Sequence, residues 1–263
     1  MKQNRGVQRF SIFVAILALA VLSCASVADI PNPFATATPT ATATFTPSST
    51  PSPTPTHTST PTPSPTGRLK EERPNGTTLF TDYDGGYQMT FLQDWTVVIL
   101  EKDNINEILD SLPEQEQNVS DLIEFAKNAD TNGILRVFGF NFKAQQNAYT
   151  PNINVSYDTD PILSAISLED LINVNTEYLP SIGMEVIDSG LQKTSSGVET
   201  GFMDIAWTLK VSSNQSVDVQ QKQVYFKSGD GMVVITFSML KDTEVDLNGD
   251  IERLIESIQL LDK

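Results

Sequence analysis

Apolar and polar residues alternate in several segments between residues 77 and 262, and this period of two predicts a protein built mainly from β-strands. The clearest alternation runs from Met203 to Val211, with Asp204 and Thr208 on the opposite face. Comparable patterns predict further strands at residues 87–91, 95–100, 134–142, 153–157, 184–192, 217–226 and 232–239.

A period of three to four residues, typical of amphipathic helices, occurs in three other places. Residues 105–126 predict two short helical pieces, residues 168–182 one helix and residues 251–261 another. Ser167 and Asp170 have the spacing of a capping box at the start of the second region. Because most strands follow one another through short turns, we expect an α+β fold with a mostly antiparallel central sheet of about seven or eight strands and flanking helices.

Residues 1–30 have the order of a secretory signal. Lys2, Arg5 and Arg9 provide a positive start, and an unbroken apolar run of 11 residues follows from Ile12 to Leu22. A helix of that length spans about 16 Å, roughly half of a bilayer core, so a permanent transmembrane helix is the weaker interpretation.

The end of this signal, Val21-Leu22-Ser23-Cys24, resembles the lipobox of bacterial lipoproteins. The resemblance implies a signal peptide at residues 1–23, and a Cys24 that carries diacylglycerol and palmitate and becomes the mature N-terminus. Lipid would then anchor the protein in the cell membrane on its extracytoplasmic face, at the cell surface or in the periplasm. An ordinary secretory signal with a chance cysteine is the alternative.

A low-complexity tract occupies residues 31–66, where 10 Pro, 13 Thr and 5 Ser occur without any Lys, Arg, Asp or Glu. Such a composition cannot bury enough apolar surface to fold, so we expect a disordered stalk. Residues 24–66 are therefore interpreted as the lipidated cysteine with its linker, and residues 67–263 as the folded domain.

Charge is concentrated in this domain. The whole chain has 17 Lys and Arg residues against 33 Asp and Glu residues, a net charge of −16. Lys2, Arg5, Arg9 and Asp29 are the charged residues before residue 67, which leaves 14 basic and 32 acidic residues and a net charge of −18 for residues 67–263. This balance argues against nucleic acid binding, because phosphate backbones are bound by clustered Lys and Arg. A protein partner is expected to present a basic surface.

The only cysteine, Cys24, and the only histidine, His57, both precede the domain. Residues 67–263 therefore lack the commonest general base and metal ligand, and they lack a thiol nucleophile. We expect no catalytic residue, no metal site and no cofactor. An envelope hydrolase that uses paired carboxylates is the alternative.

Three local motifs give only weak evidence for a function. Ser238 and Lys241 match the S-x-x-K motif of β-lactamases, but its partner motifs are missing, so we interpret Ser238 as the end of a strand. The run Glu244–Glu252 has the rhythm of a calcium loop, yet its twelfth position is Ile255, which favours a polar loop. N-x-S/T sequons, which would suit a eukaryotic secreted protein with a mucin-like stalk, begin at Asn75, Asn118, Asn154 and Asn214.

Two segments resemble PsbP-like domains. The C-terminal one is a hairpin made by Val224–Phe226 and Met232–Ser238, followed by a final helix, and the N-terminal one comprises Gly86, Tyr87, Met89, Phe91 and Trp95. The resemblance covers most of residues 77–262 and implies an α-β-α sandwich around a central antiparallel sheet. Its residues are mainly core positions, so it concerns the fold and leaves function open.

These observations predict a lipid-anchored extracytoplasmic protein that presents a non-enzymatic binding domain on a flexible stalk. A protein partner or an envelope complex is its expected target.

Overall fold

The computed structural model describes residues 65–99, 133–146, 149–212, 215–242 and 247–261. The signal, Cys24, the Thr/Pro tract and the helical pieces expected at residues 105–126 lie outside these ranges and stay predictions. Among the described residues, no helix is both long and apolar enough to cross a membrane.

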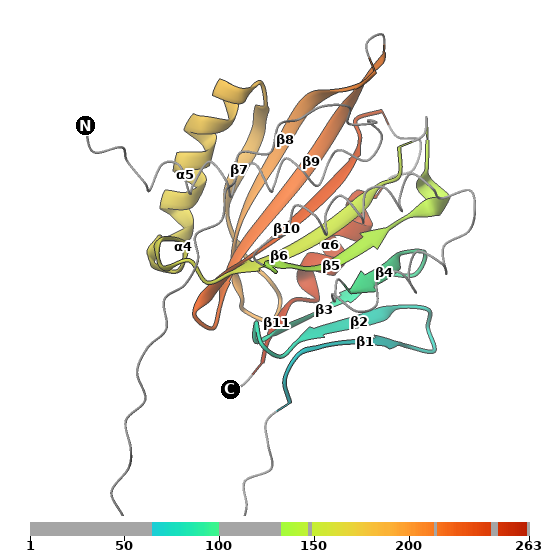
Figure 1. The fold of residues 1–263 in the computed structure, drawn as a ribbon, viewed down its shortest axis with the longest axis vertical. Coiled ribbons are helices and arrows are strands. Elements are labelled where there is room, and N and C mark those ends of the chain that lie inside the picture. The colour runs from blue at the N-terminus through green and yellow to red at the C-terminus, as the bar shows by residue number, and fades with distance from the viewer. Residues whose placement is uncertain (1–64, 100–132, 147–148, 213–214, 243–246, 262–263) are drawn as a thin grey trace, which may run out of the picture. The chain divides into compact units, whose positions relative to one another are not determined.

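Seven strands form one sheet in which every neighbouring pair is antiparallel (Figure 1). Their spatial order is β4 (Thr96–Ile99), β5 (Leu135–Phe140), β6 (Asn152–Asp158), β10 (Gly231–Leu240), β9 (Gln215–Ser228), β8 (Glu199–Ser212) and β7 (Glu185–Lys193). The central strand β10 therefore pairs with β6 on one side and with β9 on the other.

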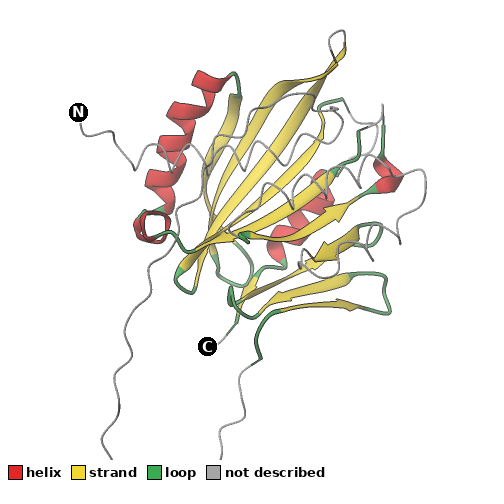
Figure 2. Ribbon diagram, viewed as in Figure 1, coloured by secondary structure: helices red, strands yellow, loops and turns green. Residues whose placement is uncertain are grey.

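A second, smaller sheet joins residues from the two ends of the domain (Figure 2). Its order is β1 (Arg68–Glu72), β2 (Thr78–Asp82), β3 (Tyr87–Phe91) and β11 (Gln259–Leu260). The side-chain amide of Gln88 donates a hydrogen bond to Gln259 Oε1 at 2.7 Å, across 171 residues of sequence.

Three α-helices accompany the sheets: α4 (Pro161–Ala165), α5 (Leu168–Tyr178) and α6 (Asn248–Glu256). Short 3-10 helices lie at Phe142–Ala144 and Leu179–Ile182. The expected capping box starts α5, since Ser167 Oγ accepts the N–H of Asp170 at 3.0 Å and donates to Asp170 Oδ2 at 2.7 Å. The apolar faces of α5 and α6 pack on opposite faces of the large sheet.

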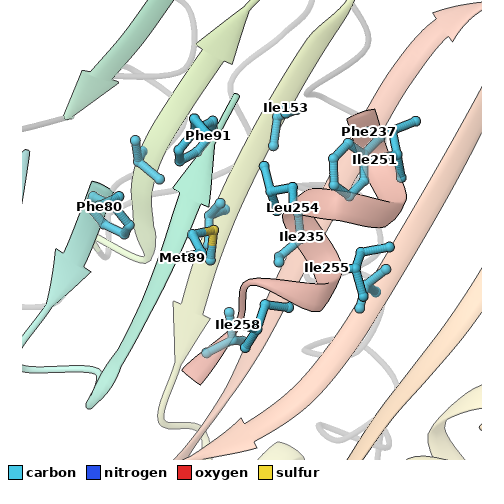
Figure 3. Packing of buried hydrophobic residues seen from close by; sticks show 14 of the residues in the cluster. Phe80, Met89, Phe91, Ile153, Ile235, Phe237, Ile251, Leu254, Ile255 and Ile258 are labelled. Carbon is cyan, nitrogen blue, oxygen red and sulfur yellow. The ribbon is translucent and has the colours of Figure 1, made fainter. Parts of the chain in front are cut away.

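The larger core lies between the two sheets and α6 (Figure 3). Met89 comes from the small sheet, Ile235 and Phe237 come from β10, and Leu254 and Ile255 come from α6. All five side chains are at most 2 % exposed. Burying each such side chain contributes about 1.5–3 kcal/mol, so this cluster is the main source of stability among the described residues.

A second core lies on the opposite face of the large sheet, under α5. Leu171 and Ile172 of the helix pack with Met203 of β8 and Tyr225 of β9. A Cβ atom at Gly201 would lie 2.7 Å from Ile172 Cδ1, so only glycine allows the helix to approach β8 this closely.

The predicted fold class is confirmed: the domain is α+β, with a mostly antiparallel central sheet and flanking helices. The hairpin predicted across residues 228–231 is also confirmed, with Gly229 at a φ of 57° in the turn between β9 and β10.

Other details of the prediction were wrong. The strands β1, β2 and β11 and the helix α4 were not expected, because they are short or lack an apolar alternation. Phe142 belongs to a 3-10 helix rather than to β5, although its ring still stacks on Phe140 with centroids 6.0 Å apart. The helix at 168–182 ends at Tyr178, and Ile182 is 45 % exposed.

Candidate functional site

A group of uncharged polar side chains lies in register on three neighbouring strands of the large sheet. In β10, Thr236 lies opposite Asn154 of β6 on one side and opposite Gln223 of β9 on the other. Two residues further along β10, Ser238 lies opposite Asn152 and Gln221 in the same way. We call these six residues the amide block: Asn152, Asn154, Gln221, Gln223, Thr236 and Ser238.

Strand periodicity places the amide block on the face that α5 partly covers. In β6, Ile153 and Val155 point into the core beside α6, so Asn152 and Asn154 point to the other face. Each side chain of the block is at most 3 % exposed. A buried polar atom costs free energy unless it is hydrogen-bonded, so the partners of these side chains decide what the block does.

On the β9 side the polar groups are connected. Gln221 Nε2 donates to Ser238 Oγ at 3.1 Å, and Gln223 Nε2 donates to Gln221 Oε1 at 3.3 Å. The hydroxyl of Tyr225 donates to Gln223 Oε1 and accepts a hydrogen bond from Asn175 Nδ2 of α5 at 3.3 Å. Burial raises the pKa of Tyr225 above its usual value, so the hydroxyl stays protonated and keeps its role as donor.

On the β6 side the groups are not connected. Asn152 Nδ2 donates to the carbonyl of Thr150 at 3.2 Å, but Asn152 Oδ1 has no hydrogen-bond partner. Asn154 Nδ2 and Thr236 Oγ1 also lack partners. One acceptor, one donor and one hydroxyl are thus left unpaired and buried on two adjacent strands.

Apolar side chains flank the amide block along the same rows of the sheet. On one side, Phe138 lies opposite Asn154 and Phe140 opposite Asn152, with the two rings stacked at 5.8 Å and 4° between their planes. On the other side, β8 places Ile205 opposite Gln221 and Met203 opposite Gln223. Trp207, two residues beyond Ile205, has a buried indole Nε1 without a hydrogen-bond partner. The arrangement combines hydrogen-bonding groups with aromatic surface and holds no charge among its six members.

A different polar cluster links the small sheet to the large one. Arg136 Nε lies 3.6 Å from Asp82 Oδ2, and the guanidinium carbon of Arg136 lies 5.2 Å from the centre of the Tyr157 ring. The Tyr157 hydroxyl donates to Asp230 Oδ1 at 2.9 Å. Burial, followed by this hydrogen bond, raises the pKa of Tyr157 to about 12. Because these charged groups are paired with one another, we assign the cluster to stability.

Paired carboxylates, the basis of the hydrolase alternative, occur next to α6. Lys222 Nζ lies 3.4 Å from Asp204 Oδ1 and 3.5 Å from Glu252 Oε1. Burial raises the pKa of Asp204, an effect that the nearby Lys222 opposes. Asp188 faces Asp204 in the pairing of β7 with β8 and raises this pKa further.

The structure locates some of the residues that were singled out from the sequence. Cys24 lies outside the described residues, as do residues 243–246 of the suspected calcium loop. Ser238, expected at the end of a strand, lies within β10, two residues before its end at Leu240, and belongs to the amide block. Asn154 is 2 % exposed, so its sequon is not accessible in the folded domain.

Metal binding gains no support within the described parts of the chain, where no three His, Cys, Asp or Glu side chains are grouped to hold an ion. Asp82 instead forms a turn, where its Oδ1 accepts the N–H of Gly85 at 2.8 Å. Asp158 acts similarly, since its Oδ1 accepts the N–H of Asp160 at 2.8 Å.

The amide block was not predicted from the sequence, because alternation predicts a strand with one buried face and one solvent-exposed face. The type of polar residue could have indicated that this face is buried. Solvent-exposed strand faces usually carry Lys, Glu or Arg, whereas this face of β6, β9 and β10 carries Asn, Gln, Ser and Thr at the block positions.

No protein-family model and no curated protein matches the sequence. Similar solved structures include the cyanobacterial PsbP of Synechocystis sp. PCC 6803, with a TM-score of 0.43, 12 % identity and coverage of 71 % of this chain and 93 % of that one. They also include LpqN of Mycobacterium tuberculosis, described as involved in cell envelope biogenesis, with a TM-score of 0.40, 12 % identity and coverage of 74 % and 90 %. The Ran-binding protein Mog1p of Saccharomyces cerevisiae has a TM-score of 0.38, 11 % identity and coverage of 75 % and 97 %. Similarity at this level assigns no family and no activity, so function is argued from the side chains.

Proposed function

We propose that this protein is a lipid-anchored extracytoplasmic lipoprotein whose domain binds a ligand at the amide block and catalyses no reaction. In this proposal the acylated Cys24 holds the chain in the membrane, and the Thr/Pro tract at residues 31–66 keeps the domain at a distance from it.

The observation that supports binding is the set of three unpaired atoms, Asn152 Oδ1, Asn154 Nδ2 and Thr236 Oγ1. An unpaired buried polar group costs about 1–3 kcal/mol. Apolar residues of similar size would remove that cost, as valine would at position 236. A ligand that hydrogen-bonds these atoms would recover the cost in the bound state, which gives the polar residues a function.

The absence of catalysis rests on the chemistry of the side chains. The amide block has no group that titrates near neutral pH, so it offers no general acid or base. The carboxylates of Asp204 and Glu252 both pair with Lys222, so an ion-pair network accounts for their arrangement without a catalytic role. A carboxylate hydrolase is therefore the weaker proposal.

A protein partner or envelope complex with a basic surface stays part of the proposal because residues 67–263 carry a net charge of −18. Such a partner would associate faster at low ionic strength, since salt screens the attraction between the two surfaces.

Two substitutions on β10 test whether the amide block is a ligand site. Thr236→Val removes an unpaired buried hydroxyl with little change of volume, so we expect it to increase the free energy of unfolding of the ligand-free protein by about 1 kcal/mol. Ser238→Ala removes the acceptor of Gln221 Nε2, so we expect it to decrease that free energy by about 1–3 kcal/mol. Urea unfolding of the full chain measures both values.

A loss of stability in Thr236→Val similar to that in Ser238→Ala would contradict the proposal. It would mean that the Thr236 hydroxyl is satisfied in solution, for instance by a buried water molecule, and that the amide block is a structural network.

A further inference from the structure

We propose that the ligand of the amide block is a neutral, polyhydroxylated molecule, that is, an uncharged segment of a glycan. This inference rests on the proposed function, because it names the chemical class of the ligand bound at that site.

The charges of the surrounding residues argue against an ionic ligand. All six side chains of the amide block are neutral, although the domain has 32 acidic residues. Lys222 lies between Gln221 and Gln223 in sequence, but strand alternation places it on the opposite face, where it pairs with Asp204. A phosphate, carboxylate or ammonium group buried here would have no counter-charge within the block, so its burial would be strongly unfavourable.

The hydrogen-bonding atoms argue against an apolar ligand. The unpaired set comprises an acceptor at Asn152, a donor at Asn154 and a hydroxyl at Thr236 that can do both. An apolar molecule would leave all three unsatisfied. Adjacent hydroxyl groups of a sugar each donate and accept, so they match a mixed set of this kind without a fixed order.

The spacing of these atoms favours a ligand with several hydroxyl groups rather than a single small one. Asn152 and Asn154 are two positions apart on one strand, which separates their Cα atoms by about 6.5–7 Å. Thr236 lies beside Asn154 on the neighbouring strand, about 5 Å away. Two or three hydroxyl groups distributed over a ring of sugar size are required to reach all three.

Aromatic rings lie beside the hydrogen-bonding atoms. Phe138 and Phe140 lie in the same two rows as Asn154 and Asn152 and have stacked, nearly parallel rings, which are buried like the block itself. The faces of sugar rings carry C–H groups that pack against aromatic surface, while their hydroxyl groups point to the sides. Once opened, the block would therefore offer hydrogen-bonding and apolar contacts side by side, as a sugar ring needs.

Burial has a kinetic consequence. Because the block side chains are at most 3 % exposed, a ligand reaches them only after local opening of the protein. We therefore expect association to be slower than the usual 10⁵–10⁷ M⁻¹s⁻¹ of preformed sites, at roughly 10⁴ M⁻¹s⁻¹ or less.

The test is titration of the full chain in detergent with defined probes. The neutral probes are tetrasaccharides of glucose and of N-acetylglucosamine, the anionic probe is a tetragalacturonate, and the peptide probe is an uncharged Gly-Ser decapeptide. Calorimetry gives the affinity, and the fluorescence of Trp207 in a Trp95→Phe background reports binding beside the block. Asn154→Ala is the test variant, and Gln88→Ala, an exposed amide of the small sheet, is the matched control.

We expect at least one neutral tetrasaccharide to bind, Asn154→Ala to weaken it at least tenfold, and Gln88→Ala to leave the affinity unchanged. Binding of the anionic or the peptide probe instead, with the same loss in Asn154→Ala, would overturn the glycan class but preserve the amide block as a ligand site. Absence of binding by all probes, together with destabilisation by Thr236→Val, would overturn both proposals.

Discussion

Lys222 shows how a single cation can compensate the charges of several neighbouring side chains. It lies within reach of Asp204 on β8 and Glu252 on α6, and its ammonium group also lies 5.2 Å from the centre of the Phe202 ring. One cation thus compensates two carboxylates on different elements. Burial outweighs the attraction of Lys222 at Asp204 and leaves the pKa of that carboxyl raised.

The raised pKa of Asp204 predicts a pH dependence of stability. The folded protein binds a proton at Asp204 more tightly than the unfolded chain does, so stability falls as pH rises from the ordinary value of 3.8 through the raised pKa. Asp204→Asn cannot titrate there. We expect the stability of the wild type relative to this variant to decrease between about pH 3 and pH 7, as measured by urea unfolding.

The exposed Asp242→Asn serves as the control for the loss of one negative charge at the surface. A wild-type advantage over Asp204→Asn that is constant or grows with pH would show that attraction to Lys222 outweighs burial at this site.

At the scale of elements, α5 and β10 show what a periodic pattern can and cannot reveal. The Ser167–Asp170 spacing correctly predicted the start of α5, because the capping hydrogen bonds are local and depend on the nearby sequence. β10 is different. Its residues are buried on both faces, although Thr236 and Ser238 alternate with apolar neighbours.

The same reasoning explains which parts of the candidate site could be predicted. Alternation predicted the strands and the direction of their side chains, so five of the six residues of the amide block could be assigned to strands, while Asn152 lies just before the strand predicted at residues 153–157. These residues come together because β6 pairs with β10, which belongs to the β9–β10 hairpin and follows β6 by about 80 residues. Spacing within one segment holds no information on such a distant pairing.

The N-cap of α5 contributes measurably to the free energy of unfolding. Ser167→Ala removes the acceptor for the N–H of Asp170, so we expect a loss of about 1 kcal/mol in the free energy of unfolding. Ser167→Asp retains an N-cap acceptor and should stay within a few tenths of the wild type. Equal losses in both variants, in parallel urea titrations, would indicate that Ser167 acts through packing instead.

At the scale of the whole molecule, the sequence divides into a basic and apolar beginning, an uncharged tract and an acidic domain. Residues 31–66 have no charged side chain, whereas residues 67–263 have a net charge of −18. An acidic domain is repelled by the anionic surface of a membrane, so under the proposed lipid anchoring a spacer and a covalent anchor would have distinct tasks.

The anchor is tested by Cys24→Ser in a bacterial host. We expect the wild type in the membrane fraction after a high-salt wash, with a mature N-terminal peptide whose mass includes acyl chains. Cys24→Ser should leave that fraction, while Ser23→Ala, which keeps a small residue before the cysteine, should behave as the wild type. A Cys24→Ser protein that stays in the washed membranes would contradict lipid anchoring.

The pairing of β11 with β3 connects Gln88 to Gln259, 171 residues apart. As the chain is synthesised, β3 emerges early, whereas the strand that completes its sheet emerges after all the other described elements. The core between the sheets also includes Ile251, Leu254 and Ile255 of α6, which emerges shortly before β11, and contacts of such large sequence separation form slowly. If the protein is exported as proposed, a newly made chain would stay open to translocation as an extended polypeptide and would complete its folding after its last strand has crossed the membrane.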